Sequence, residues 1–154
     1  MSHFTEDAKA IALALPVNHR LLGLDLGTKT IGMATSDLTR QIATPRHTLA
    51  RTKFTVDARE LLEFAAQEQI GLLVLGLPLN MDGSEGPRAQ ATRAFARNLA
   101  KLSHLPLVYW DERLSTAAVT RTMLEADLSR AKRADNVDKL AATYILQSLL
   151  DALR

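Results

Sequence analysis

Apolar residues along the chain follow two spacings, and each spacing predicts a different kind of element. Near the start, three short segments have the length of β-strands: 21–26, which is rich in branched apolar residues, 31–36, and 43–49, which Pro45 interrupts. The sequence GTKT separates the first two, and a short polar turn between strands indicates a hairpin. The sheet is therefore expected to begin with three strands in an antiparallel meander.

The rest of the chain alternates between helical and extended patterns. Residues 54–69 form an amphipathic helix in which Leu61 and Ala65 share the apolar face and Asp57 lies on the exposed one. Further along, the pattern predicts a strand in IGLLVLGLPLN, a helix from Ser84 to about residue 102, a strand over 105–110, a helix over 115–126, a basic loop in DLSRAKRAD and a last helix from Asp135. Helices thus alternate with strands after the meander.

This order favours an α/β fold with a five-stranded mixed sheet and helices on both faces. The early hairpin excludes the all-parallel order of dinucleotide-binding domains. A length of 154 residues, of which 47% are hydrophobic, suits a single core. We expect one domain over residues 20–154, preceded by an N-terminal extension over residues 1–19.

Composition narrows the chemistry that the chain can support. Cysteine is absent, which excludes a disulfide framework and a thiolate metal site, and no two of the four histidines have the spacing of zinc ligands. A bound metal would therefore need oxygen ligands, which suit Mg²⁺ or Mn²⁺. The formal charge of +2 is weak support for a polyanionic partner. Whether the chain binds one must be judged from the local distribution of its charges.

The sequence offers no sign of a membrane partner or of export. Its longest apolar runs are far shorter than a membrane span. Glu6 and Asp7 lie where a secretory signal carries positive charge, which argues against a signal peptide. Together with the absence of cysteine, this makes a cytoplasmic location the expectation.

Three acidic residues occupy positions that could converge. Asp25 lies within the first strand, Glu112 directly follows the last strand, and Asp138 lies in the first turn of the last helix. If the first and last strands are parallel, both strand acids point toward one edge of the sheet, where ligands bind in open α/β sheets. Three close carboxylates repel one another unless a divalent cation neutralises them. We therefore predict that these acids are metal ligands and catalytic residues.

Each acid also has a simpler interpretation. Asp25 could accept hydrogen bonds from the tight hairpin turn that follows it. Glu112 could be an ion-pair partner of Arg113 or an exposed loop residue. Asp138 could serve only to stabilise the start of a helix through the helix dipole. The burial cost of an acid among Leu22, Leu24 and Leu26 favours the functional interpretation for Asp25.

Four motifs, LGLDLGTKTIGMATSD, LGLPLNMDGSEG, YWDERLST and DNVDKLAATYILQSLLD, resemble those of the bacterial pre-16S rRNA nuclease family. Its members are also called Holliday-junction-resolvase-like proteins and have an RNase H-like fold. The resemblance covers nearly everything after Arg20. It implies a metal-dependent nuclease that matures the 5′ end of precursor 16S rRNA in the cytoplasm, with a pre-ribosomal particle as partner.

The resemblance also places the acidic triad of that family on Asp25, Glu112 and Asp138. Many RNase H-like nucleases carry the second acid at the end of the fourth strand, where this chain has GLPLN; Asp82 is the alternative if Glu112 does not reach the site. For the reaction, we expect a metal-activated water to attack phosphorus and expel a 3′ oxygen, which leaves a 5′ phosphate. The protein is expected to act as a monomer or a weak homodimer.

Basic residues near these acids predict a nucleic-acid surface. Between Gly86 and Trp110 there are basic residues but no acid, and several of them recur at helical spacing on one face. A second basic group lies ahead of the last helix, and a polar turn at Asn80 could present backbone N–H groups to a phosphate. The predicted nucleic-acid-binding residues are Lys29, Asn80, Arg88, Arg93, Arg97, Arg113, Arg130, Lys132 and Arg133.

Three other functions compete with RNA processing. The first is a DNA resolvase that cuts branched junctions as a symmetric dimer. The second is a non-catalytic RNA-binding module, which needs the basic surface but not the acids. The third is an actin-like nucleotide-binding domain, since GLDLGTKT resembles its phosphate loop, but such proteins close two related domains over ATP and DLGT occurs here once.

Overall fold

The computed structural model describes residues 3–115 and 130–154, with side chains for residues 4–115 and 140–154. The elements, in chain order, are α1 (His3–Ala14), β1 (Arg20–Leu26), β2 (Thr30–Ser36), β3 (Ala43–Ala50), α2 (Phe54–Gln67), β4 (Ile70–Leu77), α3 (Pro87–Ala100), β5 (Leu107–Asp111), the 3₁₀ turn η1 (Glu112–Leu114) and α5 (Arg130–Ala152). None of the helices in the described ranges is long and apolar enough to cross a membrane.

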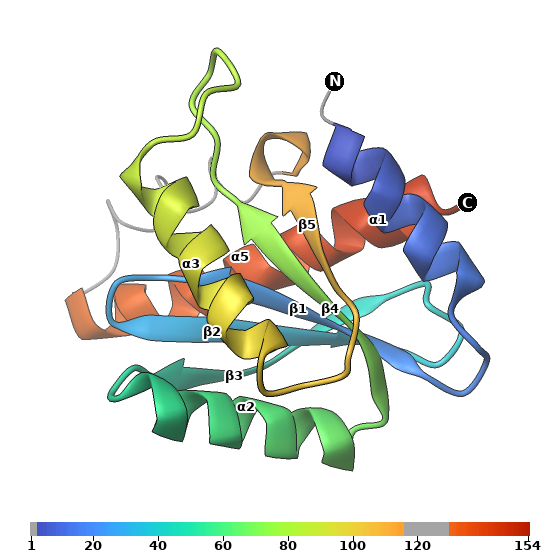
Figure 1. Ribbon diagram of the computed structural model, residues 1–154, viewed down its shortest axis with the longest axis horizontal. Coiled ribbons are helices and arrows are strands. Elements are labelled where there is room, and N and C mark those ends of the chain that lie inside the picture. The colour runs from blue at the N-terminus through green and yellow to red at the C-terminus, as the bar shows by residue number, and fades with distance from the viewer. Residues whose placement is uncertain (1–2, 116–129) are drawn as a thin grey trace.

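The five strands form one mixed sheet in the order β3-β2-β1-β4-β5 (Figure 1), which confirms the predicted fold class. β1 to β3 are the predicted antiparallel meander, whereas β4 runs parallel to β1 and β5 runs parallel to β4. The carboxyl ends of β1, β4 and β5 therefore lie along one edge of the sheet, called here the carboxyl edge.

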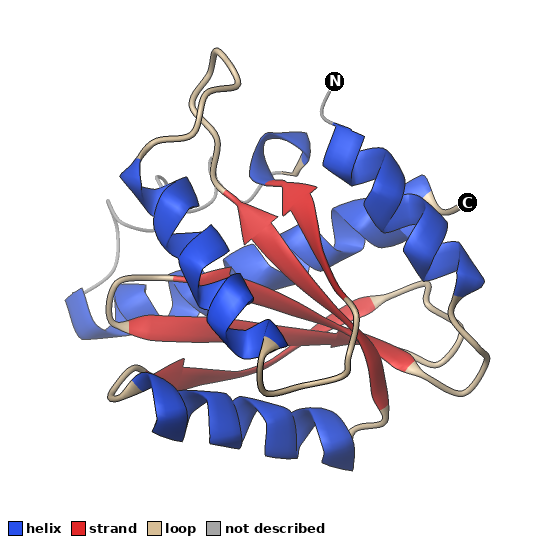
Figure 2. Ribbon diagram, viewed as in Figure 1, coloured by secondary structure: helices blue, strands red, loops and turns tan. Residues whose placement is uncertain are grey.

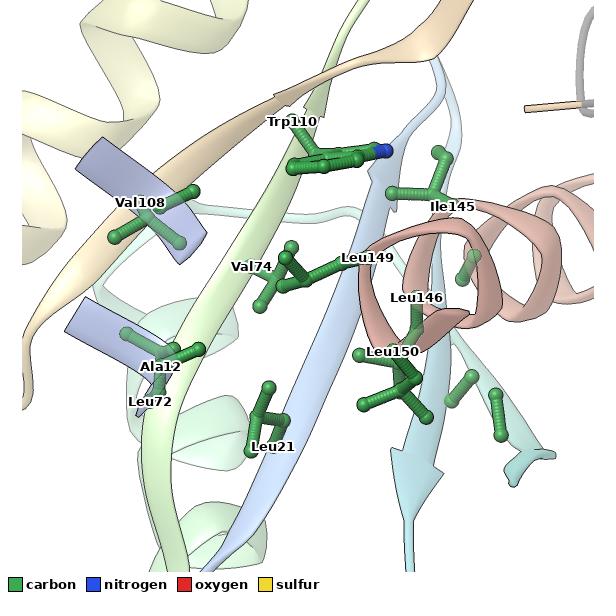
Figure 3. Packing of buried hydrophobic residues seen from close by; sticks show 14 of the residues in the cluster. Ala12, Leu21, Leu72, Val74, Val108, Trp110, Ile145, Leu146, Leu149 and Leu150 are labelled. Carbon is green, nitrogen blue, oxygen red and sulfur yellow. The ribbon is translucent and has the colours of Figure 1, made fainter. Parts of the chain in front are cut away.

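Helices cover both faces of the sheet (Figure 2). On one face, α1 and α5 pack over a cluster that includes Leu21, Val74 and Trp110 (Figure 3). On the other face, α2 and α3 pack over a cluster that includes Leu22 and Leu24. Successive residues of β1 thus alternate between the two clusters, as the period of two in a strand requires, and β1 is buried on both sides.

Two glycines let α5 approach the sheet closely. A Cβ atom on Gly23 of β1 would lie 2.8 Å from Leu146 Cβ and 3.0 Å from the Ala142 carbonyl oxygen. A Cβ atom on Gly76 of β4 would collide with the Ile145 side chain. The backbones of β1 and α5 can therefore come together only because Gly23 has no side chain.

The structure corrects the predicted starts of two helices. α3 begins at Pro87 rather than Ser84, because the Ser84 N–H and hydroxyl both bond to Asp82 in a separate turn, and proline is favourable in the first helical turn. α5 begins at Arg130, so the segment predicted as a basic loop is already helical there. The helix predicted over 115–126 lies outside the described residues.

Two further segments differ in burial from the sequence-based picture. Asp57, predicted on the wet face of α2, is buried, and its carboxylate accepts hydrogen bonds from the N–H and the hydroxyl of Thr52. Residues of the expected N-terminal extension form α1, whose Ala8 and Ala12 belong to the buried cluster shared with α5.

Candidate metal and nucleic-acid site

Asp25 lies near the carboxyl end of β1 and is only 1% exposed. It shares the face of Gly23, which contacts α5, since side chains two residues apart in a strand point the same way. Its cross-strand partner on β2 is Gly32, which adds no side chain beside it. The predicted strand acid is therefore a buried carboxylate that faces α5 at the carboxyl edge.

Glu112 lies at the same edge, directly after β5, and is 3% exposed. β5 is held in register with β4 through the pair Leu77 and Asp111, and Trp110 is tied to α5 by a 3.0 Å bond from its indole N–H to Ser148. The N–H and the hydroxyl of Ser115 both donate to the Glu112 carbonyl, which fixes the turn. The structure thus brings Asp25 and Glu112 to one edge of the sheet, as predicted.

Asp138 lies in α5, but its side chain is outside the described residues. Among the side chains that are described, no three acidic or histidine groups form a metal-binding cluster. Asp25 and Glu112 supply only oxygen donors, which fits a hard divalent cation such as Mg²⁺ and requires at least one more ligand from elsewhere. Asp82, the alternative second ligand, is exposed, and its hydrogen bonds with Ser84 lower the pKa of its carboxyl.

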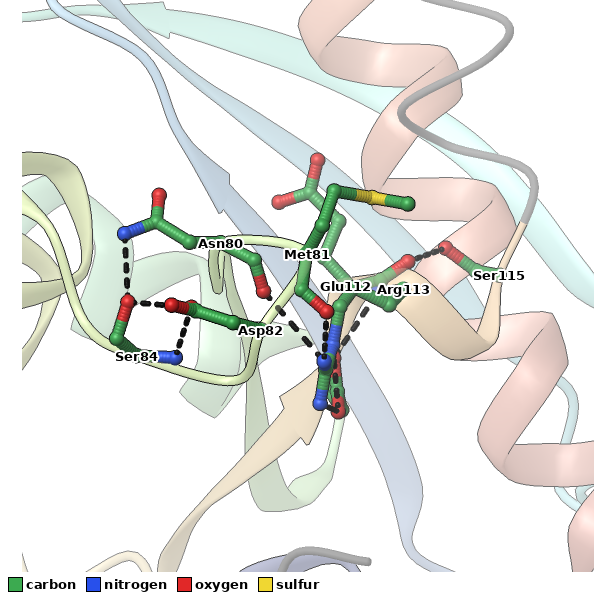
Figure 4. A network of polar contacts seen from close by, with 8 residues as sticks. Asn80, Met81, Asp82, Ser84, Glu112, Arg113 and Ser115 are labelled. Carbon is green, nitrogen blue, oxygen red and sulfur yellow. Dashed lines mark hydrogen bonds and ion pairs between the residues drawn. The ribbon is translucent and has the colours of Figure 1, made fainter.

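The loop between β4 and α3 is anchored to the end of β5 by Arg113 (Figure 4). The guanidinium of Arg113 makes paired bonds with the buried Asp111 carboxylate, including one of 2.7 Å, and also donates to the carbonyls of Asn80 and Met81. Asp111 raises the pKa of Arg113 through these bonds. Arg113, predicted to contact nucleic acid, therefore already holds the loop in place.

The predicted residues Asn80 and Arg88 line a pocket of about 300 Å³ together with Glu112. Asn80 is exposed, and its side-chain amide donates to the Ser84 hydroxyl. Arg88 is the second residue of α3, is exposed, and donates to the Leu26 carbonyl at 3.3 Å. The pocket is thus lined by both a buried acid and a basic side chain at the carboxyl edge.

The remaining predicted cations differ in their surroundings. Arg93 is paired with Glu85 at 2.7 Å, which raises the pKa of Arg93, and its guanidinium lies 4.7 Å from the centre of the Tyr109 ring. Arg97 on α3 and Lys29 in the turn between β1 and β2 are exposed. Arg130, Lys132 and Arg133 lie in the first turn of α5, where side chains are not described.

Sequence reasoning missed Arg51 and Asp111. Arg51 follows β3 and reaches across to donate to the Gly27 carbonyl at 2.8 Å. Asp111 was part of the motif YWDERLST, but its role as the partner of Arg113 depends on the geometry at the end of β5. Arg51 carries no local signal, because it acts through a contact with a segment distant in the sequence. Asp111 has one, since an aspartate at the start of a helical turn is a favourable N-cap residue.

Comparison with known proteins gives a consistent result. A family model described as "RuvX: Holliday junction resolvase" matches residues 19–152. A protein of Methylocella silvestris is 63% identical over 135 residues, covering 88% of this chain and 84% of its own length, and one of Rhodobacter capsulatus is 63% identical over 142 residues, covering 92% and 89%. Both are named "Putative pre-16S rRNA nuclease".

A solved structure, Thermus thermophilus RuvC in complex with a Holliday junction substrate, superposes on this chain with a TM-score of 0.56. The superposition covers 88% of this chain and 96% of RuvC, at 10% sequence identity. Similarity at this level of identity concerns the fold, and it supports the RNase H-like architecture expected from the motifs.

Proposed function

The chain belongs to the RuvX family described as Holliday junction resolvase, and from that premise we propose that it is a nuclease that hydrolyses phosphodiester bonds in precursor 16S rRNA. One structural observation carries the proposal. The first and the last strands of the sheet, 87 residues apart at Asp25 and Glu112, deliver two buried carboxylates to the same edge. Burying two carboxylates at one place costs free energy unless their charge is compensated, and a bound divalent cation would compensate it.

Asp138 is the proposed third ligand, and the packing of α5 supports it. Near the amino end of β1, Gln147 of α5 donates to the Gln41 carbonyl, whereas Ala142 of α5 contacts Gly23 farther along β1. Two more strand residues, from Gly23 to Asp25, advance about 6.6 Å. That distance equals roughly four helical residues at about 1.5 Å each, which leads from Ala142 to Asp138.

Asp25, Glu112 and Asp138 would together hold Mg²⁺ or Mn²⁺. Such an ion neutralises the acids, lowers the pKa of a bound water and stabilises the charge that develops on phosphate oxygens. The chain contributes the rigid placement of these acids on β1, η1 and α5. The anchored loop at Asn80 and the cation of Arg88 border Glu112 and would orient the RNA backbone there.

The proposal also covers the location, the partners and the oligomeric state of the protein. Precursor rRNA as the substrate places the protein in the cytoplasm, in contact with pre-ribosomal particles, as a monomer or a weak homodimer. The basic residues Lys29, Arg97, Arg130, Lys132 and Arg133 would add contacts to the RNA backbone around the acidic site.

Cleavage of a precursor 16S RNA fragment tests the proposal. With Mg²⁺ or Mn²⁺, the wild type should cut this RNA, and EDTA should stop the reaction. Asp25→Asn and Glu112→Gln should each lower the rate by about 10²–10³-fold, the usual loss when a charge-stabilising group is removed from an active site. Glu63→Gln, which alters an exposed acid of α2, is the matched control and should retain the wild-type rate.

A four-way DNA junction provides the competing substrate in the same assay. The RuvX description and the likeness to RuvC make junction cleavage the second candidate activity. Faster cleavage of the junction than of the RNA would assign the site to DNA. Full activity of Asp25→Asn, or cleavage that EDTA leaves unchanged, would contradict the proposed role of the acids on either substrate.

A further inference from the structure

A small pocket of about 60 Å³ lies at the end of β1, on the α3 side of the sheet. Gly27 and Thr28 of the turn after β1 form one wall, Thr92 of α3 forms another, and Arg51 and Arg88 complete the lining. Among the described residues that line it, none is acidic. Leu26 and Ala91 also line it, so the pocket is small and largely apolar, with two arginines as its charged groups.

Arg51 is held in this pocket by the surrounding fold. Its Nη1 donates to the Gly27 carbonyl at 2.8 Å, and its guanidinium lies 5.7 Å from the centre of the Phe95 ring. Its backbone N–H donates to the Lys29 carbonyl, and the next residue, Thr52, is bonded to buried Asp57. These contacts fix the backbone and the guanidinium before any ligand arrives, so less side-chain entropy is lost on binding.

Arg88 connects this pocket to the proposed metal site. Its Nη2 donates to the Leu26 carbonyl at 3.3 Å, and Arg88 also lines the pocket that contains Glu112. Leu26 and Gly27 directly follow Asp25 in the chain. A polyanionic strand that crosses the carboxyl edge would therefore meet the acids on the α5 side and these two arginines on the α3 side.

The two arginines differ from three other arginines of the described chain in what they bond. Arg46, Arg93 and Arg113 each pair with a carboxylate: Glu68, Glu85 and Asp111. In the described part of the chain, Arg51 and Arg88 donate instead to backbone carbonyls, which orient a guanidinium without cancelling its charge. Two positive charges thus converge on a pocket of roughly phosphate size, and an anion there would compensate both.

We infer that Arg51 and Arg88 bind a backbone phosphate of the substrate strand, one that neighbours the phosphate at the acidic site. The inference rests on the proposed nuclease function for the identity of the strand. The contact is to phosphate oxygens and not to bases, so it sets the position and the direction of the strand without selecting sequence. The ligand is a phosphodiester within the polymer.

Binding without cleavage tests this site separately from catalysis. A fluorescent precursor 16S RNA fragment is titrated in EDTA at several salt concentrations. Arg51→Gln and Arg88→Gln should each weaken binding and reduce the dependence of log affinity on log salt by about 0.7–0.9, the value for one lost phosphate contact. Arg59→Gln, an equal loss of charge at an exposed position on α2, should leave both quantities unchanged.

A chemically modified RNA identifies the phosphate. A single neutral methylphosphonate, moved along the strand, should at one position weaken wild-type binding and have no further effect on Arg51→Gln. Arg51→Lys should restore most of the salt dependence, which excludes misfolding as the cause of the loss. Because the assay contains no divalent metal, an inactive enzyme would not affect the result.

Two results would overturn the inference. Wild-type affinity and salt dependence in both glutamine variants would show that the pocket takes no part in RNA binding. At constant ionic strength, stronger competition by inorganic phosphate for the wild type than for Arg51→Gln would instead assign the pocket to free phosphate. If the wild type binds the RNA through both arginines but does not cleave it with Mg²⁺ or Mn²⁺ present, only the nuclease proposal is contradicted.

Discussion

Within the described ranges four carboxylates are buried, and the contacts of two of them show a structural role. Asp57 accepts hydrogen bonds from Thr52, and Asp111 is paired with Arg113, so each stabilises a local turn. Asp25 lies in β1 and Glu112 directly follows β5, so both lie at the carboxyl edge. Burial alone does not separate the four acids. Asp111 also lies at the carboxyl end of β5, and its pairing with Arg113 is what marks it as structural.

A fifth acid, Asp37, provides a test of stability against pH. The N–H of Ile42, the Thr39 hydroxyl and the N–H of Gln41 donate to its carboxylate and lower its pKa from 3.8 to about 2. Because the folded-state pKa is the lower one, this contribution is complete above the unfolded value and is lost as pH falls toward 2. Asp37 is exposed, so the effect should be small.

Asp37→Asn keeps an acceptor but no longer titrates, so its free energy of unfolding should fall less steeply than that of the wild type between about pH 4 and pH 2. Urea unfolding at a series of pH values measures the difference. Asp7→Asn, which removes an exposed carboxylate from α1 and none of these bonds, should follow the wild type. Parallel curves for the wild type and Asp37→Asn would contradict the assignment.

At the scale of elements, the close packing of α5 on β1 depends on Gly23. Gly23→Ala should destabilise the protein by about 1–3 kcal/mol, because the new methyl group meets the Ala142 carbonyl and Leu146 Cβ and α5 must move away. Gly76→Ala is the matched comparison. Its three nearest contacts are all atoms of the Ile145 side chain, which can change rotamer, so it should cost less. Urea unfolding of both variants measures the difference, and an equal loss would refute this account.

Element identity was predictable, but some boundaries were not. The strands β1 and β4 were evident because both of their faces are buried and their sequences are almost wholly apolar. The start of α3 was misplaced because Ser84, a favourable N-cap residue, is used by Asp82 in the preceding turn. Local preference cannot show which of two neighbouring partners a side chain will take.

The positions of the two acids in the site were predictable, but the position of Arg51 was not. Asp25 and Glu112 could be placed at one edge from strand order and direction alone, since parallel strands bring their carboxyl ends together. Arg51 could not, because its position beside Gly27 depends on the pairing of β3 with β2, which brings the end of β3 next to the turn between β1 and β2. Contacts between separate segments require the register of the sheet, which no single sequence window contains.

At the scale of the whole molecule, one edge of the sheet gathers the acids, the anchored loop and the cations. The net charge of +2 conceals this, because acids elsewhere balance many of the arginines. A ligand that binds only the folded state stabilises that state. A metal held by both β1 and η1, which are distant in sequence, can bind only when the sheet is complete.

Divalent metal should therefore raise the unfolding temperature. At about 100 times its Kd, Mg²⁺ or Mn²⁺ would add about 2.7 kcal/mol, or roughly 5–10 °C for a domain of this size. Thermal unfolding with and without EDTA measures the rise. Asp25→Asn should abolish it, whereas Glu63→Gln should retain it; an equal rise in Asp25→Asn would place the metal elsewhere.

The order of strands has a further consequence during synthesis. β1 lies at the centre of the sheet, but its parallel partner β4 is made only after β2, β3 and α2. Until residues 70–77 leave the ribosome, a strand that is apolar on both faces has one open hydrogen-bonding edge. The nascent chain thus passes through a stage at which this open edge is a site for pairing with other chains, and the synthesis of β4 closes it.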